Sequence, residues 1–234
     1  FWMWLVAFLG ASTAYIESTL GQIYKEKDDK GLYRGGPAFY IEKAMGQKWY
    51  AMIFAVVTII ATGFLLPGVQ ANSIAAGFDN AWGIPTMVTG ACIVVALGLI
   101  IFGGVKRIAL FAEIVVPFMA LAYIVMALVI MAVNYEQVPV VIALILKSAF
   151  GLDAGFGAVI GLAVQWGVKR GVYSNEAGQG TGPHAAAAAE VSHPAKRGYV
   201  QAFSIYVHTL LVCSATAFMI LCTGKYNVAH PDGS

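Results

Sequence analysis

Charged residues are scarce in this sequence. Asp, Glu, Lys and Arg together make up 11% of its 234 residues, whereas hydrophobic residues make up 59%. A soluble domain carries about 25% charged residues, so this chain would leave far too much apolar surface in water. The composition therefore excludes an ordinary soluble domain and predicts a protein whose solvent is lipid.

Residues that build metal, redox or catalytic centres are also few. The three cysteines, Cys92, Cys213 and Cys222, lie in apolar segments without the spacing of metal ligands or a redox pair. We interpret them as small hydrophobic residues. The four histidines are scattered along the chain, and none stands with a nucleophile or a metal-ligand partner. We therefore expect no enzyme activity and no cofactor.

Long apolar runs indicate a multi-span membrane protein. About 20 apolar residues in a helix cross about 30 Å of hydrocarbon, and six runs approach this length. We expect an all-α protein with a single transmembrane domain over residues 1–234, and a piece of a longer transporter. The spans are predicted at 1–21, 50–74, 85–103, 108–133, 138–168 and 198–223.

The basic residues fall on one side of these spans. Twelve of the 14 lysines and arginines lie in the connections 22–49, 104–107 and 169–197, which follow the first, third and fifth spans. The connections after the second and fourth spans carry none. Cytoplasmic loops carry an excess of Lys and Arg. The three basic connections are therefore predicted to be cytoplasmic, in a multi-pass protein of the plasma (inner) membrane.

The fifth span is predicted to be broken around 151–157, a segment that holds three glycines and Asp153. An unwound segment at membrane depth must be buried in protein or line a wet cavity, and such segments mark substrate and ion sites in transporters. A helical hairpin turn, or a loop between two interfacial helices, is the alternative. Asp153 is either an ion-pair partner of Lys147 or a cation ligand.

Polar side chains inside the other spans are the next candidates. Gln70 and Asn72 follow a Pro-Gly pair, and their amides suit either a zwitterionic ligand or an interhelical hydrogen bond. His208, followed by Thr209, is either a proton relay or a hydrogen-bonding group. Trp166 is either a membrane-belt aromatic residue or a gate over the site.

A polar segment rich in small residues follows the fifth span, at 174–184. Asn175 and Glu176 lie in it, just beyond the expected break. They are interpreted either as part of an inner gate or as part of a tightly packed cytoplasmic turn.

The run Lys-Arg-Gly-Val-Tyr-Ser-Asn-Glu-Ala-Gly at 169–178, with Gly180 after it, resembles the signature of the alanine or glycine:cation symporter family. Further segments match that family in order and rough spacing, at 35–41, 69–73, 116–119 and 192–196. The resemblance covers nearly the whole chain. It implies a leucine-transporter-like fold of two inverted helical repeats, in which these spans are core helices two to seven.

The resemblance also implies a site. Gln70 would contact polar substrate atoms, and Asn72 lies close to it in sequence. Phe156 and Ile160 would restrict the side chain to the size of alanine or glycine, beside the open backbone of Gly155 and Gly157. Most of the sodium site is expected from helices outside this sequence.

One position departs from the family. An acidic residue is expected immediately before Thr209, and His208 stands there instead. The choice between sodium and proton as the coupling ion, and the stoichiometry, are therefore open.

The resulting hypothesis is import of a small neutral amino acid, driven by sodium through alternating access. Its partners are the amino acid, sodium and the lipid bilayer, with no nucleic acid. Proton coupling on the same fold is the alternative. A channel or a membrane-embedded enzyme is less well supported, because no ring of like charges and no catalytic constellation occurs. The preferred amino acid or enantiomer and the oligomeric state are left open.

Overall fold

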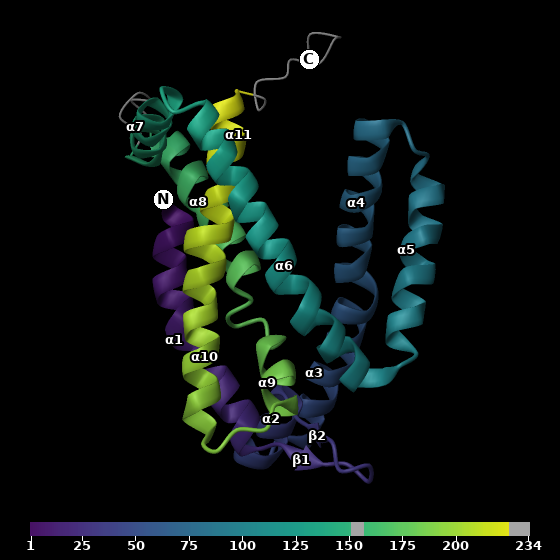
Figure 1. Cartoon of the computed structure of the whole chain (residues 1–234). Coiled ribbons are helices and arrows are strands. Elements are labelled where there is room, and N and C mark those ends of the chain that lie inside the picture. Colours follow the sequence, from purple (N-terminus) through teal and green to yellow (C-terminus); the bar gives the residue numbers. More distant parts are fainter. Residues whose placement is uncertain (151–156, 225–234) are drawn as a thin grey trace. The chain divides into compact units, whose positions relative to one another are not determined.

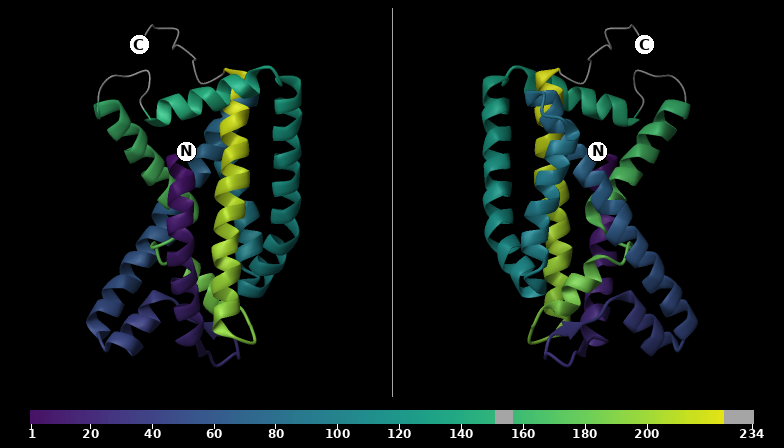
Figure 2. Two further views of the ribbon diagram at one scale, coloured as in Figure 1. Left: turned by 90° about the vertical axis from the view of Figure 1, so that its left-hand side faces the viewer. Right: turned by 90° about the vertical axis from the view of Figure 1, so that its right-hand side faces the viewer.

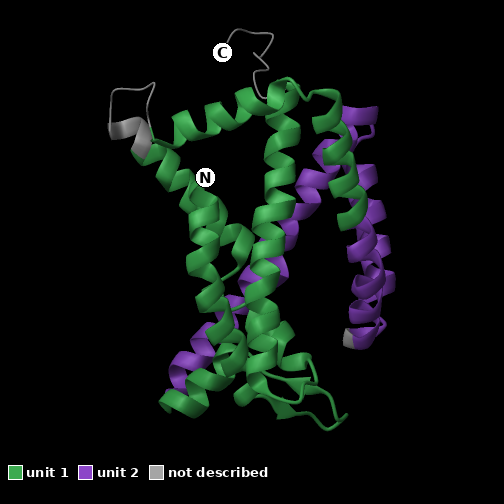
Figure 3. Ribbon diagram, turned by 60° about the vertical axis from the view of Figure 1, so that its left-hand side comes forward, with its two compact units in different colours: residues 1–46, 120–234 green, residues 47–119 purple. Residues whose placement is uncertain are grey.

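The structure, a computed structural model, describes residues 1–150 and 157–224. It is built almost entirely of helices (Figure 1). The chain divides into two compact units, which Figure 3 shows in different colours. Unit 1 contains Phe1–Gly46 and Ala120–Ser234, and unit 2 contains Gln47–Met119. Each unit is described by itself.

Unit 2 is built around one long apolar helix. This long helix consists of α3 (Lys48–Ile60), the π-helical segment η1 (Ala61–Leu65) and α4 (Leu66–Trp82). Proline has no N–H and disturbs a helix interior, and Pro67 lies in the first turn of α4, directly after the wider π-helical turn. The long helix therefore continues past this proline. α4 packs against α5 (Thr86–Ile101), and α6 begins at Gly104.

Unit 1 is arranged around α1 (Trp2–Ile23). This helix packs against α8 (Gly157–Asn175), α9 (Gly182–Ala188) and α10 (Pro194–Tyr206). The α10 helix continues without interruption through a π-helical segment into α11. The remaining bounds are α6 to Val133, α7 (Gln137–Phe150), η2 (Val207–Cys213) and α11 (Ser214–Thr223).

A stripe of small residues explains why α1 can lie at the centre of unit 1. The stripe is buried at helical spacing and consists of Ala7, Ala11, Ala14, Ser18 and Gly21. Small residues let helix backbones approach closely in membranes. The approach is closest near Gly198 of α10, where an added Cβ would lie 2.3 Å from the Thr19 hydroxyl oxygen.

The connection after α1 folds into a small hairpin and a short helix. Strands β1 (Glu26–Lys27) and β2 (Tyr33–Arg34) pair antiparallel, and α2 (Pro37–Met45) follows. We call this end of unit 1 the basic end. Its basic residues are Lys25, Lys27, Lys30, Arg34, Lys43, Lys196 and Arg197.

Three helices of the described residues are long and apolar enough to cross a membrane: Lys48–Trp82, Lys106–Val133 and Pro194–Thr223. They coincide with the predicted spans 50–74, 108–133 and 198–223. Two further apolar helices, Thr86–Ile101 and Gln137–Phe150, are shorter. An all-α membrane protein is thus confirmed at this level, with the two-residue strands of the hairpin as a small addition.

The predicted fifth span corresponds to two helices of different direction. α7 ends at Phe150 and α8 begins at Gly157. α7 lies crosswise to the α10–η2–α11 helix (Figure 2), so it does not continue the direction of α8. The expected break residues Asp153, Gly155 and Phe156 lie outside the described residues.

The expected cytoplasmic loop 169–197 is largely helical. α8 continues to Asn175, past the predicted end at residue 168, and α9 and the start of α10 occupy much of the rest. Lys169 and Arg170 lie on α8 with their charged groups over the Trp166 ring, at 5.3 and 5.6 Å from its centroid. Long basic side chains are good helix formers, so charge alone does not end this helix.

Candidate functional site

Two glycines place α8 directly against the first half of α1. A Cβ on Gly167 would lie 2.4 Å from the Trp2 Cβ, and one on Gly171 would lie 2.8 Å from the Val6 Cβ. The helices therefore touch along their backbones. α8 and α1 also line an apolar cavity of about 390 Å³, into which Thr13 of α1 contributes a polar group.

Asn175, the last residue of α8, joins three helices. Its Nδ2 donates to the Val6 carbonyl oxygen of α1 over 3.1 Å, and its Oδ1 accepts from the Thr209 hydroxyl of η2 over 2.6 Å. Asn175 is 4% exposed and Thr209 is 0% exposed. A Cβ at Gly10 would come within 2.7 Å of the Asn175 amide nitrogen. The absence of a side chain at Gly10 therefore makes room for this amide.

Two further side chains extend this contact along η2. The Ser174 Oγ lies 3.3 Å from the Thr209 Oγ1 and 3.2 Å from the Cys213 Sγ. We call Ser174, Asn175, Thr209 and Cys213 the polar cluster. π-Helical turns are rare overall, but those that occur are often found at functional sites. The η2 segment spaces Thr209 and Cys213 so that both side chains reach the end of α8.

The chain after α8 leaves helical geometry in an unusual way. Glu176 has φ 54°, the only positive value of a non-glycine among the described residues. Such a conformation costs about 1–3 kcal/mol and persists where its surroundings hold it. The Glu176 carboxylate accepts a hydrogen bond from the Thr181 hydroxyl at 2.7 Å. The Gly178 N–H donates to the Glu17 carboxylate of α1 at 3.1 Å.

A polar pocket of about 200 Å³ lies beside the polar cluster. The end of α8 and Glu176 form one wall, and the α10–η2 helix forms the other. The pocket is lined by Ser174, Asn175, Glu176, Gln201, Ser204, Ile205 and His208. Its lining combines one acidic group and one imidazole with neutral hydrogen-bonding groups.

At the basic end, side chains from the end of α1 and just after it donate hydrogen bonds to carbonyl oxygens at the end of α9. The Gln22 amide donates to the carbonyl oxygens of Ala186 and, over 2.8 Å, of Ala189. The Lys25 ammonium also donates to the Ala189 oxygen, over 2.8 Å. Burial lowers the pKa of Lys25, and Glu190 opposes this shift. These bonds satisfy carbonyls at the C-terminal end of a helix, where no further turn follows.

The hairpin is held by charge. The Lys43 ammonium lies 2.9 Å from the Glu26 carboxylate, and Arg34 lies 3.6 Å from it. The hydrogen bond from Lys43 lowers the pKa of Glu26, with attraction to both cations adding to it. On α2, burial raises the pKa of Tyr40 to about 12, and the negative charge of Glu17 adds to this effect.

The structure brings together most of the residues predicted to be gating or ion-linked. Asn175, Glu176, His208 and Thr209 all belong to the polar cluster or line the polar pocket. Trp166 lies more than two turns earlier on α8; it is 54% exposed, and the charged groups of Lys169 and Arg170 lie over its ring. Asp153 lies outside the described residues.

The predicted substrate residues belong to both units. Gln70 and Asn72 lie on α4 in unit 2 and are exposed within that unit. Gly157 begins α8, and Ile160 lies in the first turn of that helix. Gly155 and Phe156 lie outside the described residues. Their role as one site stays a prediction.

Sequence reasoning missed several residues that the structure places at the site. Cys213 was interpreted as a small hydrophobic residue, but its thiol contacts Ser174. Glu17, a carboxylate within the predicted span 1–21, was given no place at the site, although it accepts a hydrogen bond from the Gly178 N–H after α8. The available signal was the presence of a carboxylate in an apolar span, which requires a partner. A metal centre of three or more His, Cys, Asp or Glu side chains is absent from the described residues.

Comparison with known proteins gives a consistent result. The sodium:alanine symporter family matches residues 1–234. YrbD of Bacillus subtilis (strain 168), provisionally named a sodium/proton-dependent alanine carrier, is 64% identical over 234 residues, which are 100% of this chain and 48% of YrbD. The sodium/proton-dependent alanine carrier protein of Bacillus sp. (strain PS3) is 56% identical over 232 residues, 98% of this chain and 51% of that protein.

A third relative broadens the range of named substrates. GlnT of Bacillus subtilis (strain 168), named a probable sodium/glutamine symporter, is 45% identical over 233 residues, 100% of this chain and 48% of GlnT. The chain spans about half the length of these curated relatives. The match over its whole length shows that this chain belongs to the sodium:alanine symporter family.

Proposed function

We propose that this chain is part of a secondary transporter that imports a small neutral amino acid together with sodium by alternating access, with the polar cluster as its inner gate. The observation that carries the gate is the buried hydrogen bond from Thr209 to Asn175. It joins the end of α8 to the α10–η2–α11 helix, while the same asparagine holds α1. Because two side chains join three helices, this contact can be made or broken as a unit. Such a contact suits a gate that has one closed and one open arrangement.

Ile160 of the proposed substrate site and Asn175 of the proposed gate lie far apart along α8. Ile160 and Asn175 belong to the same helix, 15 residues apart, which corresponds to about 22 Å along the axis at about 1.5 Å per residue. A small amino acid cannot touch both. Alternating access requires a binding site that is separate from the barrier that opens toward one side, and α8 supplies both positions.

We assign the substrate to the residues that the family resemblance implies. Gln70 binds its polar atoms, with Asn72 close by in sequence. Phe156 and Ile160 limit its side chain to the size of alanine or glycine, beside the backbone of Gly155 and Gly157. Two relatives are named for alanine, which agrees with this size limit.

The fold that accommodates this mechanism is the leucine-transporter-like inverted repeat, with the described helices as core helices two to seven. The basic end then faces the cytoplasm, as expected for Lys-rich and Arg-rich connections of an inner-membrane protein. The long α10–η2–α11 helix is one crossing of this bundle. Sodium is a coupling ion here, and most of its ligands come from outside this chain.

The sodium gradient suffices for accumulation. One sodium ion that moves through 100 mV gains about 2.3 kcal/mol, and a tenfold concentration gradient adds about 1.4 kcal/mol. Their sum supports roughly 500-fold accumulation of the substrate. Proton coupling is the second candidate, because His208 lines the polar pocket and the names of two relatives include the proton.

Uptake by the full-length protein tests the function. The protein is reconstituted in liposomes, and uptake of labelled alanine is measured with and without an inward sodium gradient at constant pH. Uptake that requires the sodium gradient supports the proposal. Equal uptake in both conditions would remove sodium coupling.

Gln70→Ala tests the substrate assignment. We expect weaker alanine binding, by about 5- to 30-fold for a loss of about 1–2 kcal/mol when the substrate loses one good hydrogen-bonding partner. Asn80→Ala, at the far end of the same helix α4, is the matched control and should bind as the unmodified protein does. Unchanged binding by Gln70→Ala would refute the role of this residue.

A further inference from the structure

His208 and Glu176 face the same polar pocket from two different elements. His208 projects from the π-helical segment η2, and Glu176 follows the end of α8. Both side chains are exposed to the pocket rather than buried in protein. His208 lies near the middle of the 30-residue apolar helix Pro194–Thr223, with 14 residues before it and 15 after it. A titratable ring at such a position in a membrane helix is a functional candidate.

His208 and Glu176 are the two ionisable residues in the lining of the pocket. Glu176 is the acidic residue of the lining, and Cys213 ends the same π-helical segment η2 that carries His208. The remaining wall of the pocket is neutral, with Gln201 and Ser204 on α10. An imidazole titrates near pH 6.5, so its charge changes within the range that cells experience.

The other titratable groups on the helices packed against η2 are not among the residues that line the pocket. Glu17 of α1 binds the Gly178 N–H. On α8, Lys169 and Arg170 lie over the Trp166 ring. On α10, Lys196 donates to Ser192 and Arg197 to Gln201. The further titratable side chains of these helices are Tyr15, Tyr24, Tyr173, Tyr199, Tyr206 and Cys222.

We propose that His208 and Glu176 form a proton-binding pair at the inner gate, and that a proton on this pair keeps the gate closed. The inference rests on the proposed transport function. A protonated ring attracts the Glu176 carboxylate across the pocket. Because Glu176 directly follows Asn175, this attraction reinforces the contact of Asn175 with Thr209. Loss of the proton removes the attraction and favours separation of α8 from η2.

Transport with a controlled internal pH tests the pair. The full-length protein is reconstituted in liposomes with fixed external pH, sodium gradient and membrane potential, and the internal pH is set between about 5.5 and 8. Internal acidification should slow alanine uptake by about two- to fivefold, the range for a partly exposed charge pair. His208→Asn and His208→Gln should give a flat, fast profile, and Glu176→Gln should lose most of the pH effect.

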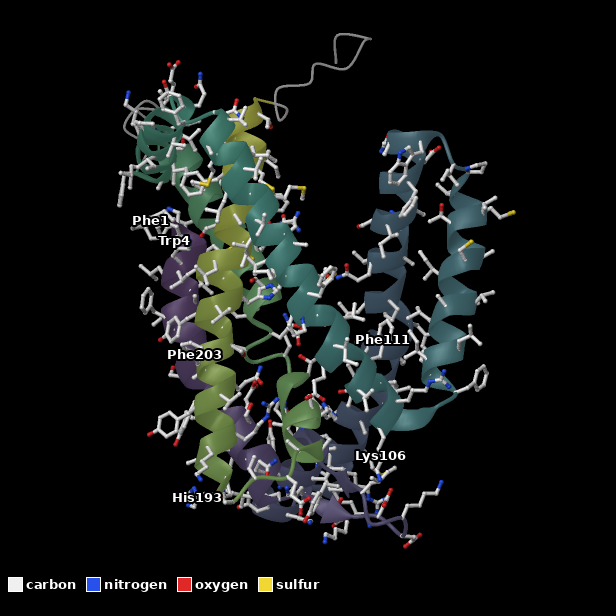
Figure 4. The ribbon with its side chains drawn as sticks, viewed as in Figure 1. Phe1, Trp4, Lys106, Phe111, His193 and Phe203 are labelled. Atoms are coloured by element: carbon white, nitrogen blue, oxygen red, sulfur yellow. The ribbon has the colours of Figure 1, made fainter. Side chains whose placement is uncertain are left out.

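His193→Asn is the matched control. His193 caps the N-terminus of α10 and accepts a hydrogen bond from the Ala195 N–H, away from the pocket, and Figure 4 labels it at the opposite end of that helix from η2. This variant should keep the pH profile of the unmodified protein. A pH profile that persists in both His208 variants, or that is absent from the unmodified protein, would overturn the proposal.

A second readout does not depend on transport. With the other cysteines replaced, the rate at which a small thiol reagent added from the cytoplasmic side modifies Cys213 reports opening of the polar cluster. Because the thiolate is the reacting form, each rate is divided by the rate of the same reagent with a free model thiol at that pH. The normalised labelling should be slower at internal pH 5.5 than at pH 8, and this difference should vanish in His208→Asn. If the protein shows no sodium-dependent alanine uptake, the proposed function fails. The pH dependence of labelling then still decides whether the proton-binding pair exists, because labelling that ignores pH contradicts it.

Discussion

Replacement of Thr209 by valine is the most direct test of the inner gate. Valine keeps the shape of threonine and removes its hydroxyl, so the packing of η2 changes little. The Asn175 Oδ1 loses its donor at 2.6 Å in a place where both residues are almost completely buried. Ser174 also loses its contact with the Thr209 hydroxyl, whereas its contact with Cys213 and the bond from Asn175 to the Val6 carbonyl remain.

The magnitude follows from the burial of this bond. A buried polar group left without its partner costs about 1–3 kcal/mol, whereas hydrogen bonds between membrane helices average about 0.6 kcal/mol and reach about 1.7. We expect a loss of about 1–2 kcal/mol from the closed arrangement. This corresponds to an increase of about 5- to 30-fold in the population of the open arrangement.

Modification of Cys213 measures this population. The Cys213 thiol lies 3.2 Å from Ser174 within the polar cluster, so opening of the cluster exposes it. In full-length protein whose only cysteine is Cys213, a small impermeant thiol reagent added from the cytoplasmic side should react about 5- to 30-fold faster with Thr209→Val, as the two-state population shift requires. Uptake of alanine should change in the same variant.

Thr216→Val is the control on the same helix. Thr216 lies on α11 and its hydroxyl is 2.6 Å from the Tyr123 hydroxyl of α6, so this variant also loses a side-chain bond but leaves the cluster intact. Its labelling rate should match that of the unmodified protein. If both variants label at the same rate, the bond between Thr209 and Asn175 only stabilises the fold, and the reasoning about a gate is refuted.

Three further predictions concern packing and charge. Gly21→Ala should lower the free energy of unfolding in detergent by about 1–3 kcal/mol, because the new Cβ would lie 2.8 Å from the Pro183 carbonyl oxygen. Gly77→Ala is the control: its Cβ would meet no atom within 4 Å, so it should be neutral or slightly stabilising. The lowered pKa of Glu26 stabilises the hairpin above pH about 4.5, and this contribution is lost as the pH falls through the folded-state pKa. Proteolysis of the β1–β2 hairpin should therefore increase in acid, and Lys43→Met should show this increase already at neutral pH; identical digestion of both proteins at neutral pH would contradict the role of the ion pair. Tyr40 should ionise near pH 12 in an absorbance titration, so the stability that it contributes is present below pH about 10 and lost as the pH rises through about 12; a late component that persists in Tyr40→Phe would assign it to another tyrosine.

The long α10–η2–α11 helix shows what the sequence could and could not predict. Its apolar residues over 198–223 identified a span, because length and composition are sufficient for that inference. They did not predict the π-helical turn at Val207–Cys213. An extra residue in a helical turn depends on side-chain contacts with another helix, and those contacts join residues 34 to 39 positions apart.

The end of α8 shows the opposite difficulty. Lys169 and Arg170 marked the start of a loop by the charge rule, but the helix continues to Asn175. The rule concerns which side of a membrane a connection occupies, and it does not locate the end of a helix. Gly171 lies against Val6, and Asn175 donates a hydrogen bond to the Val6 carbonyl oxygen. The last turns of α8 are therefore packed against α1.

The sequence by itself indicated a membrane protein, the approximate positions of the longest helices and the family, because these depend on local composition and on the order of residues. It also named Asn175, Glu176, His208 and Thr209 as candidates, since each is polar in or beside an apolar span. Only the tertiary structure decided that these four belong together, because α8 and η2 come side by side through glycine and alanine contacts on α1. Close approach of backbones is a property of pairs of helices, and neither sequence segment carries it alone.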